Sequence, residues 1–321
     1  MPNALVIHHN DPDGRMGGYI MMKYFLNKGF TVGTIEADYD MEFNFEKLLT
    51  PEDTVCIVDF SLKNGVMKQL LQIVSSDNVI WIDHHKSAIE NCKEGESLDG
   101  FRYNGISGCE LAWLYANGYR QRKTEFAVKV VTNDLSIEKI ENIEIPYGVK
   151  LIGDYDCWRK QIAESEDFIV GLESHWNELT MDNKDGDKVW DAILNSDMEV
   201  IKTLISDGKI IRRYIDTMND KAIKSRGFEV KLHKFEQYKC IAINSDTPNS
   251  WIFNSVFDNY HIGIVFRYNE KTKPTMTFSI YRLGLDKERE IDCSKIAFSY
   301  GGGGHPGASG FSTSGTLPFV R

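Results

Sequence analysis

The chain has 321 residues, of which 42% are hydrophobic, and its formal net charge at pH 7 is −10. This length suits two domains, and the composition excludes a disordered chain or a fibrous repeat, while no apolar run approaches the roughly 20 residues of a membrane span. Six scattered cysteines without a C-x-x-C pair argue against disulfides and structural zinc, and with no secretory signal evident we expect a cytoplasmic protein.

Strands and helices alternate in the first half of the chain. The apolar segment Ala4–His8 is followed by the turn residues Asn10–Gly14, and apolar positions then recur at helical spacing as far as Leu26. Further strands are expected at Thr31–Glu36, Thr54–Asp59 and Asn78–Asp83, and helices at Lys63–Val74, Gly108–Ala116, Glu125–Thr132 and Tyr147–Asp154. This alternation predicts an α/β domain with a doubly wound, mostly parallel sheet.

The pattern changes twice in the second half. Helical spacing continues over residues 186–225, which predicts a helical connector. Short β-rich segments follow at Glu229–His233, Cys240–Asn244, His261–Tyr268 and Thr275–Arg282. We therefore expect a first domain over residues 1–185 and a smaller α/β domain over 226–321, with the active site in the cleft between them. The first 225 residues carry 38 acidic and 25 basic side chains, so this part of the chain is suited to holding cations.

Four apolar runs of the first domain end in aspartate or histidine. The carboxyl ends of parallel strands face one crevice, so these side chains can converge there although they lie far apart in the sequence. Four clustered carboxylates cannot all stay ionised unless cations neutralise them, and two divalent ions would do so. Imidazole and carboxylate ligands without thiolate favour Mn²⁺, with Co²⁺, Fe²⁺ or Mg²⁺ as alternatives. The candidate ligands are His9, Asp11, Asp13, Asp59, His84 and Asp154.

The order of these motifs resembles that of the DHH phosphoesterase superfamily. Its signature is present as Asp83-His84-His85, and the other motifs are His9-x-Asp11-x-Asp13-Gly14, Asp59-x-Ser61 and Gly153-Asp154. The run Gly302-Gly303-Gly304-His305 resembles the GGGH signature of the DHH-associated domain. The segment Gly153–Trp158, together with the single C-terminal domain, resembles the oligoribonuclease (nanoRNase) and exopolyphosphatase-related branch.

The resemblance implies a metal-dependent phosphoesterase with two divalent ions. His9 and Asp11 would hold one ion, the group Asp13, His84 and Asp154 would hold the other, and Asp59 would bridge them. Two alternatives stay open, namely His8 in place of His9 and Asp156 in place of Asp154.

Three further residues have expected roles around the metals. Asp83 would accept an imidazole N–H and so fix the tautomer that binds metal. His85 would bind a phosphate oxygen or assist the leaving group, or alternatively support His84. Asp59, His85 and His305 are therefore the candidate catalytic residues.

The glycine run is a candidate phosphate site. Successive glycines allow backbone N–H groups to form an anion-binding nest, and a helix expected to start at Pro306 would add its dipole. The expected substrate-binding residues are Gly302, Gly303, Gly304, His305 and Arg282.

The function that the resemblance implies is Mn²⁺-dependent hydrolysis of short oligoribonucleotides. Alternatives are a phosphatase for pAp, pyrophosphate or short polyphosphate, a phosphodiesterase for cyclic or linear dinucleotides, and a nucleotide-binding module without activity. Because affinity for long nucleic acid comes mainly from Lys and Arg, an acidic chain favours short oligonucleotides over a long duplex. We expect no membrane partner, and a homodimer stays open.

Overall fold

A computed structural model describes residues 3–38, 41–85, 88–89, 92–95, 97–119, 143–246, 249–269, 275–286, 290–304, 306–314 and 316–320. The chain divides into two compact units, residues 1–211 and 212–321, and the division falls inside helix α10, Met198–Arg226. Within the described ranges, no helix is both long and apolar enough to cross a membrane. The expected helix Glu125–Thr132 and the candidate residue His305 lie outside the described residues.

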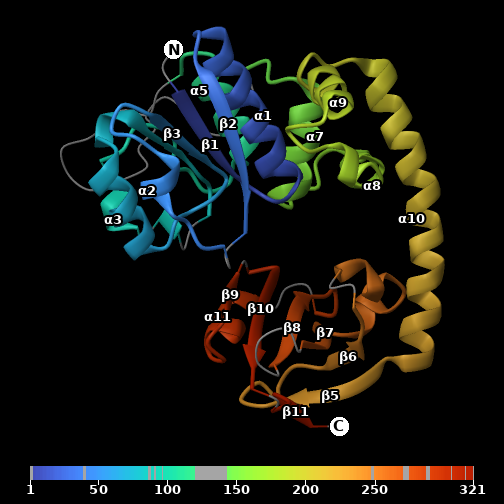
Figure 1. Cartoon of the computed structure of the whole chain (residues 1–321). Helices are drawn as coiled ribbons and strands as arrows, with labels where there is room; N and C mark the ends of the chain where they lie inside the picture. Colours follow the sequence, from blue (N-terminus) through green and yellow to red (C-terminus); the bar gives the residue numbers. More distant parts are fainter. Residues whose placement is uncertain are drawn as a thin grey trace. The chain divides into compact units, whose positions relative to one another are not determined.

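A parallel sheet of four strands forms the centre of the first unit (Figure 1). The strands are β1 (Asn3–His9), β2 (Thr31–Ala37), β3 (Thr54–Val58) and β4 (Val79–Ile82), in the order β2-β1-β3-β4. Every neighbouring pair runs parallel, which confirms the predicted doubly wound sheet. The strand order reverses between β1 and β3, and open sheets of this kind bind ligands at the carboxyl ends beside such a reversal.

Helices cover both faces of this sheet. One face packs on α1 (Pro12–Asn27) and α5 (Gly108–Ala116), and the helices α7 (Tyr147–Asp156), α8 (Ser165–Glu173) and α9 (Lys184–Leu194) pack in turn against these helices and one another. The other face packs on α2 (Phe45–Leu48) and α3 (Asn64–Ile73). Short 3₁₀ helices are η1 (Ser76–Asn78), η2 (Lys93–Gly95) and η3 (Trp176–Glu178). Successive side chains of β1 point to opposite faces of the sheet, so that Val6 packs on the α1 side and Ile7 on the α3 side. Helix α9, expected in the connector, belongs to this core through Trp190 and Ile193.

Helix α1 starts earlier than the glycine at position 14 suggests. Asp11 caps it by accepting a hydrogen bond from the Gly14 N–H at 2.7 Å, and Pro12 takes the first helical position. Gly14 therefore lies inside the helix and not in the expected turn. A Cβ atom on Gly14 would lie 2.4 Å from the His9 carbonyl oxygen, so glycine is what lets the helix begin against the end of β1.

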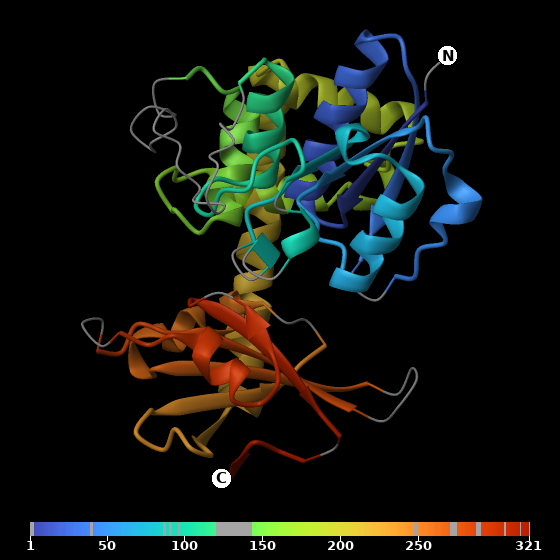
Figure 2. The same cartoon turned by 90° about the vertical axis from the view of Figure 1, so that its left-hand side faces the viewer.

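A mixed sheet of seven strands forms the second unit (Figure 2). Its strands are β5 (Phe228–Leu232), β6 (Cys240–Asn244), β7 (Ile262–Asn269), β8 (Thr275–Arg282), β9 (Gly303–Gly304), β10 (Ala308–Thr313) and β11 (Phe319–Val320), in the order β11-β5-β6-β7-β8-β10-β9. Helix α11 (Cys293–Phe298) contributes to one hydrophobic cluster, and η4 (Ser250–Asn259) and the end of α10 to another. This second α/β unit confirms the predicted fold class.

The glycine run forms part of a β-hairpin. Gly303 and Gly304 pair antiparallel with Gly310 and Ser309. The expectation of a helix at Pro306 is wrong, because that residue lies in a bend that leads directly into β10. A Cβ atom on Gly302 would lie 2.1 Å from the Gly310 carbonyl oxygen. The close approach of these two segments is therefore enough to require a glycine at this position.

Candidate metal centre

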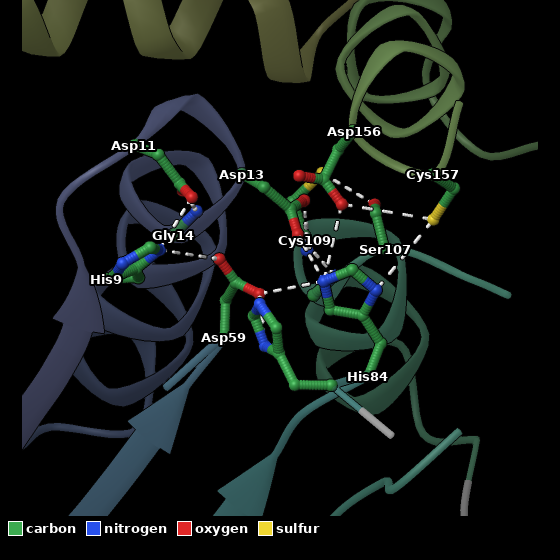
Figure 3. Close-up of polar contacts among 12 residues, drawn as sticks. His9, Asp11, Asp13, Gly14, Asp59, His84, Ser107, Cys109, Asp156 and Cys157 are labelled. Atoms are coloured by element: carbon green, nitrogen blue, oxygen red, sulfur yellow. Dashed lines mark hydrogen bonds and ion pairs between the residues drawn. The ribbon is translucent and has the colours of Figure 1, made fainter. Parts of the chain in front are cut away.

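Asp59 lies in the middle of a cluster of imidazoles and carboxylates (Figure 3). It follows β3, is fully buried and has φ of 51°, in the left-handed region that non-glycine residues rarely adopt. Its Oδ2 lies 3.7 Å from Nδ1 of His9, and its Oδ1 lies 3.1 Å from Nε2 of His84. The two oxygens thus face imidazoles from two different strand ends, as in a carboxylate that bridges two cations.

His9 and Asp11 form one side of the cluster. The Asp11 Oδ2 lies 2.6 Å from the His9 Nδ1. Burial lowers the pKa of His9, but the carboxylates of Asp11 and Asp59 outweigh it and raise the pKa to about 11. Burial raises the pKa of Asp11, and its contact with His9 overcomes this and lowers the pKa to about 2. In this structure the two side chains therefore form an ion pair.

His8 lies on the opposite side of β1 from this cluster, because side chains alternate along a strand. It is 1% exposed, and its Nδ1 lies 3.0 Å from the His9 carbonyl oxygen. A Cβ atom on Gly18 would lie 2.6 Å from the His8 ring, which shows how closely His8 packs against α1. The geometry favours His9 over His8 as the candidate ligand.

His84, Asp13 and Asp156 form the other side of the cluster. The His84 Nε2 lies 3.3 Å from Asp156 Oδ2 and 3.7 Å from Asp13 Oδ2. Asp13 accepts hydrogen bonds from the backbone N–H groups of Gly108 and Cys109, at 2.6 and 2.9 Å. Because these groups are the first of helix α5, the positive end of that helix holds the Asp13 carboxylate in place.

Asp154 does not join this cluster, which corrects the preference for it over Asp156. Its carboxylate accepts hydrogen bonds from the Ser165 hydroxyl at 2.7 Å and from the backbone N–H groups of Gln161 and Ile162 at 2.9 and 3.3 Å. Both aspartates belong to α7, and residues two apart on a helix point about 200° apart. Only one of them can face the sheet end, and it is Asp156.

Asp83 holds His85. Its Oδ1 lies 2.8 Å from the His85 Nδ1 and accepts the backbone N–H groups of His84 and His85, while the Ser61 hydroxyl donates to its Oδ2. Burial lowers the pKa of His85, but Asp83 outweighs it and raises the pKa to about 9. The imidazole that Asp83 orients is thus that of His85, whereas the sequence pointed to a ligand imidazole.

The donor set fits divalent cations. Both carboxylate oxygens of Asp59 and the His84 Nε2 are buried and make no hydrogen bond of regular geometry, although Nε2 lies 3.1 Å from Oδ1, and a bound cation would satisfy these atoms. Burial and then the neighbouring Asp13 raise the pKa of Asp59 to about 7, and the contacts with His84 and His9 offset this only in part. Among the residues that the structure describes, three groups have ligand atoms within 4.8 Å of one another: His9, Asp11 and Asp59; Asp59, His84 and His85; and His84, Asp156 and Cys157.

Several of these contacts had no role in the sequence interpretation. Ser61 belongs to the recognised Asp59-x-Ser61 motif, which is the signal that could have revealed its bond to Asp83. The Ser107-x-x-Glu110 capping box, which the structure contains, is a sequence signal for the start of α5 but not for its contact with Asp13. Cys157, whose Sγ lies 3.8 Å from the His84 Nδ1, carried no signal of its own.

The candidate phosphate-binding residues belong to the second unit. Arg282 is exposed at the end of β8, and its backbone N–H donates to the Gly307 carbonyl at 2.9 Å. Tyr281 and Trp251 of this unit are buried. Phosphate binding by Arg282, the glycine run and His305 stays a prediction.

Comparison with solved structures defines the class of fold. The DHH domain of PF0399, a protein described as a member of the s1p family of ribosomal proteins, superposes with a TM-score of 0.59 at 13% identity, covering 96% of this chain and 82% of that one. The chain therefore has the DHH-domain fold, which confirms at the level of the fold the resemblance drawn from Asp83-His84-His85. No protein-family model matches the sequence.

Two further comparisons name particular proteins. The uncharacterized protein R106 of Acanthamoeba polyphaga mimivirus is 24% identical over 293 residues, which are 88% of this chain and 59% of that protein. This chain thus spans less than two thirds of its relative. RecJ from Thermus thermophilus in complex with Mn²⁺ gives a TM-score of 0.47 at 14% identity, covering 97% of this chain and 49% of that one.

Proposed function

We propose that the chain is a phosphoesterase that uses two divalent metal ions. The observation that carries this proposal is Asp59, whose two buried oxygens face His9 on one side and His84 on the other at ion-pair distance, without a hydrogen bond of regular geometry. A bridge between two cations would satisfy both oxygens directly.

The ligands divide into two groups that share Asp59. His9 and Asp11 would hold the first ion, and Asp13, His84 and Asp156 the second. The mixture of imidazole and carboxylate favours Mn²⁺. When bound, two such ions lower the pKa of a water and neutralise charge on the phosphoryl oxygens.

His85 is placed to act on the substrate. Its Nδ1 is fixed by Asp83, which favours the protonated imidazole, and it lies 3.7 Å from Asp59 Oδ1 at the edge of the cluster. A protonated imidazole there can donate to a phosphoryl oxygen or give its proton to the leaving oxygen. Ser61 and Asp83 would act as positioning residues for this group.

We propose short oligoribonucleotides as the substrates. The net charge of −10 supports short ligands over long ones, because polymer binding draws its affinity from many lysines and arginines. The Gly302–Gly304 hairpin and Arg282 would supply phosphate contacts in this proposal.

In the test, the purified chain is incubated with Mn²⁺ and, in separate reactions, with a 5-mer RNA, pAp, a linear dinucleotide, a cyclic dinucleotide or polyphosphate. We expect the RNA to be shortened, and an Asp59→Asn variant to lose both hydrolysis and bound Mn²⁺. Full activity of Asp59→Asn would contradict the bridging role. Hydrolysis of pAp or polyphosphate alone would contradict the nuclease assignment but not the phosphoesterase.

A further inference from the structure

Trp158 is an exposed aromatic residue that closely follows the candidate ligand Asp156 in the chain. It is 47% exposed and comes two residues after Asp156, whose carboxylate contacts His84. Its neighbour Cys157 has its Sγ 3.8 Å from the His84 Nδ1. Since consecutive Cα atoms are about 3.8 Å apart, the Cα atom of Trp158 lies within about 8 Å of that of Asp156.

Trp158 follows the C-terminus of α7 in a left-handed backbone conformation. Its φ is 54°, and its N–H group and that of Arg159 donate to the carbonyls of Tyr155 and Asp154, the usual pattern where a helix ends. The end of the helix therefore fixes the backbone of Trp158, two residues beyond Asp156.

Asp154 imposes the conformation. Its buried carboxylate accepts the backbone N–H groups of Gln161 and Ile162, and its carbonyl accepts the Arg159 N–H at 3.0 Å. The Trp158 N–H donates to the Tyr155 carbonyl at 3.1 Å. The same helix thus supplies Asp156 to the metal cluster and, through Asp154, fixes the turn that exposes the tryptophan.

We propose that Trp158 is a stacking platform for a nucleobase of the substrate. This inference rests on the proposed function and adds to it that the site recognises the base as well as the phosphate. Stacking on an aromatic ring tolerates every base, because each base has a π face. Trp158 is therefore a determinant of affinity for nucleotides over other phosphate esters.

Charge at the turn suits the same ligand. The Lys160 Nζ lies 5.3 Å from the centre of the Trp158 ring and 3.8 Å from the Glu166 Oε1, and the Lys160 side chain is 64% exposed. An ammonium group there places a positive charge beside the ring, which complements the phosphate that accompanies every base of an oligonucleotide.

The experiment compares binding of AMP and of ribose 5-phosphate to the Mn²⁺-loaded chain by calorimetry. The two ligands share the sugar and phosphate and differ in the base. We expect wild-type protein to bind AMP about tenfold more tightly, and Trp158→Ala to bind both equally. Trp158→Phe should keep most of the preference, since it keeps an aromatic face.

Phe298→Ala is the matched control, because Phe298 is a 78% exposed aromatic of the second unit, and it should leave both affinities unchanged. Equal binding of the two ligands by wild type, no binding of AMP, or a preference that survives in Trp158→Ala would each overturn the inference. These measurements require no hydrolysis. A failure of the proposed function is detected by a different measurement: the Asp59→Asn variant would then still bind Mn²⁺.

Discussion

Two aspartates on one helix illustrate how closely spaced residues can differ in role. Asp154 and Asp156 are the same residue type two positions apart, yet one accepts hydrogen bonds from a turn and the other faces His84. The sequence motif could not separate them, because both follow the same glycine in the same apolar helix. The direction of each side chain around the α7 axis separates them.

Substitution of these two residues should have opposite effects. We expect Asp156→Asn to lose bound Mn²⁺ while its unfolding free energy without metal is unchanged or higher, because a crowded carboxylate is removed. Asp154→Ala should lower the unfolding free energy by about 1–3 kcal/mol, because buried donors would lose their hydrogen-bond acceptor. The folded protein should still bind Mn²⁺. Metal content and urea unfolding measure both, and a reversed pattern would restore Asp154 as the ligand.

Metal binding should release protons. The pKa of His9 is raised from its ordinary 6.5 to about 11, so its imidazole carries a proton at pH 7 in the absence of metal. A cation binds only the neutral imidazole, so Mn²⁺ affinity should rise as pH rises from about 6 to 9.

Calorimetry in buffers of different ionisation enthalpy measures this release. We expect at least one proton per chain at pH 7, and less from a His9→Gln variant. Affinity that stays flat with pH, with no proton released, would show that His9 is not a ligand.

Among the secondary-structure elements, helix α5 shapes the cluster because its N-terminus packs against Asp59 and Asp13. A Cβ atom on Gly108 would lie 2.5 Å from the Asp59 Cβ and 3.0 Å from Asp13 Oδ2. Gly108 is therefore required by the approach of the helix to the end of β3 and not by a turn.

Gly108→Ala should destabilise the first unit by about 1–3 kcal/mol and weaken Mn²⁺ binding, because helix and carboxylates must move apart. The control is Gly65→Ala in helix α3, where an added Cβ meets nothing within 4 Å and should stabilise by up to about 1 kcal/mol. Thermal unfolding and Mn²⁺ titration measure both variants. Equal behaviour of the two would mean that α5 is not held against Asp59.

At the scale of the molecule, the candidate ligands all belong to the unit of residues 1–211. Mn²⁺ should therefore stabilise that unit selectively, by about 2.7 kcal/mol when the ion is at 100 times its dissociation constant. Hydrogen exchange with and without Mn²⁺ should show protection rising in β1, β3 and β4 and unchanged in β6 to β8. Equal gains in both units, or gains that persist in Asp59→Asn, would contradict a metal site built by the first unit alone.

Much of the first unit could be predicted from local pattern. Short apolar runs that end in polar residues located β1, β3 and β4, and the parallel arrangement then placed His9, Asp59 and His84 at one edge. The start of α1 was harder to predict, because Asp13-Gly14 is typical of a turn. The contact of Gly14 with the end of β1 explains why a glycine lies inside the helix.

The sequence by itself determined the alternation of strands and helices and the residues at the strand ends, because periodicity and turn chemistry act over a few neighbouring positions. The tertiary structure decided which aspartate of α7 joins the cluster, which histidine Asp83 holds, and that Gly303 and Gly304 pair with β10. These outcomes depend on packing between segments far apart in the chain, so no local pattern encodes them.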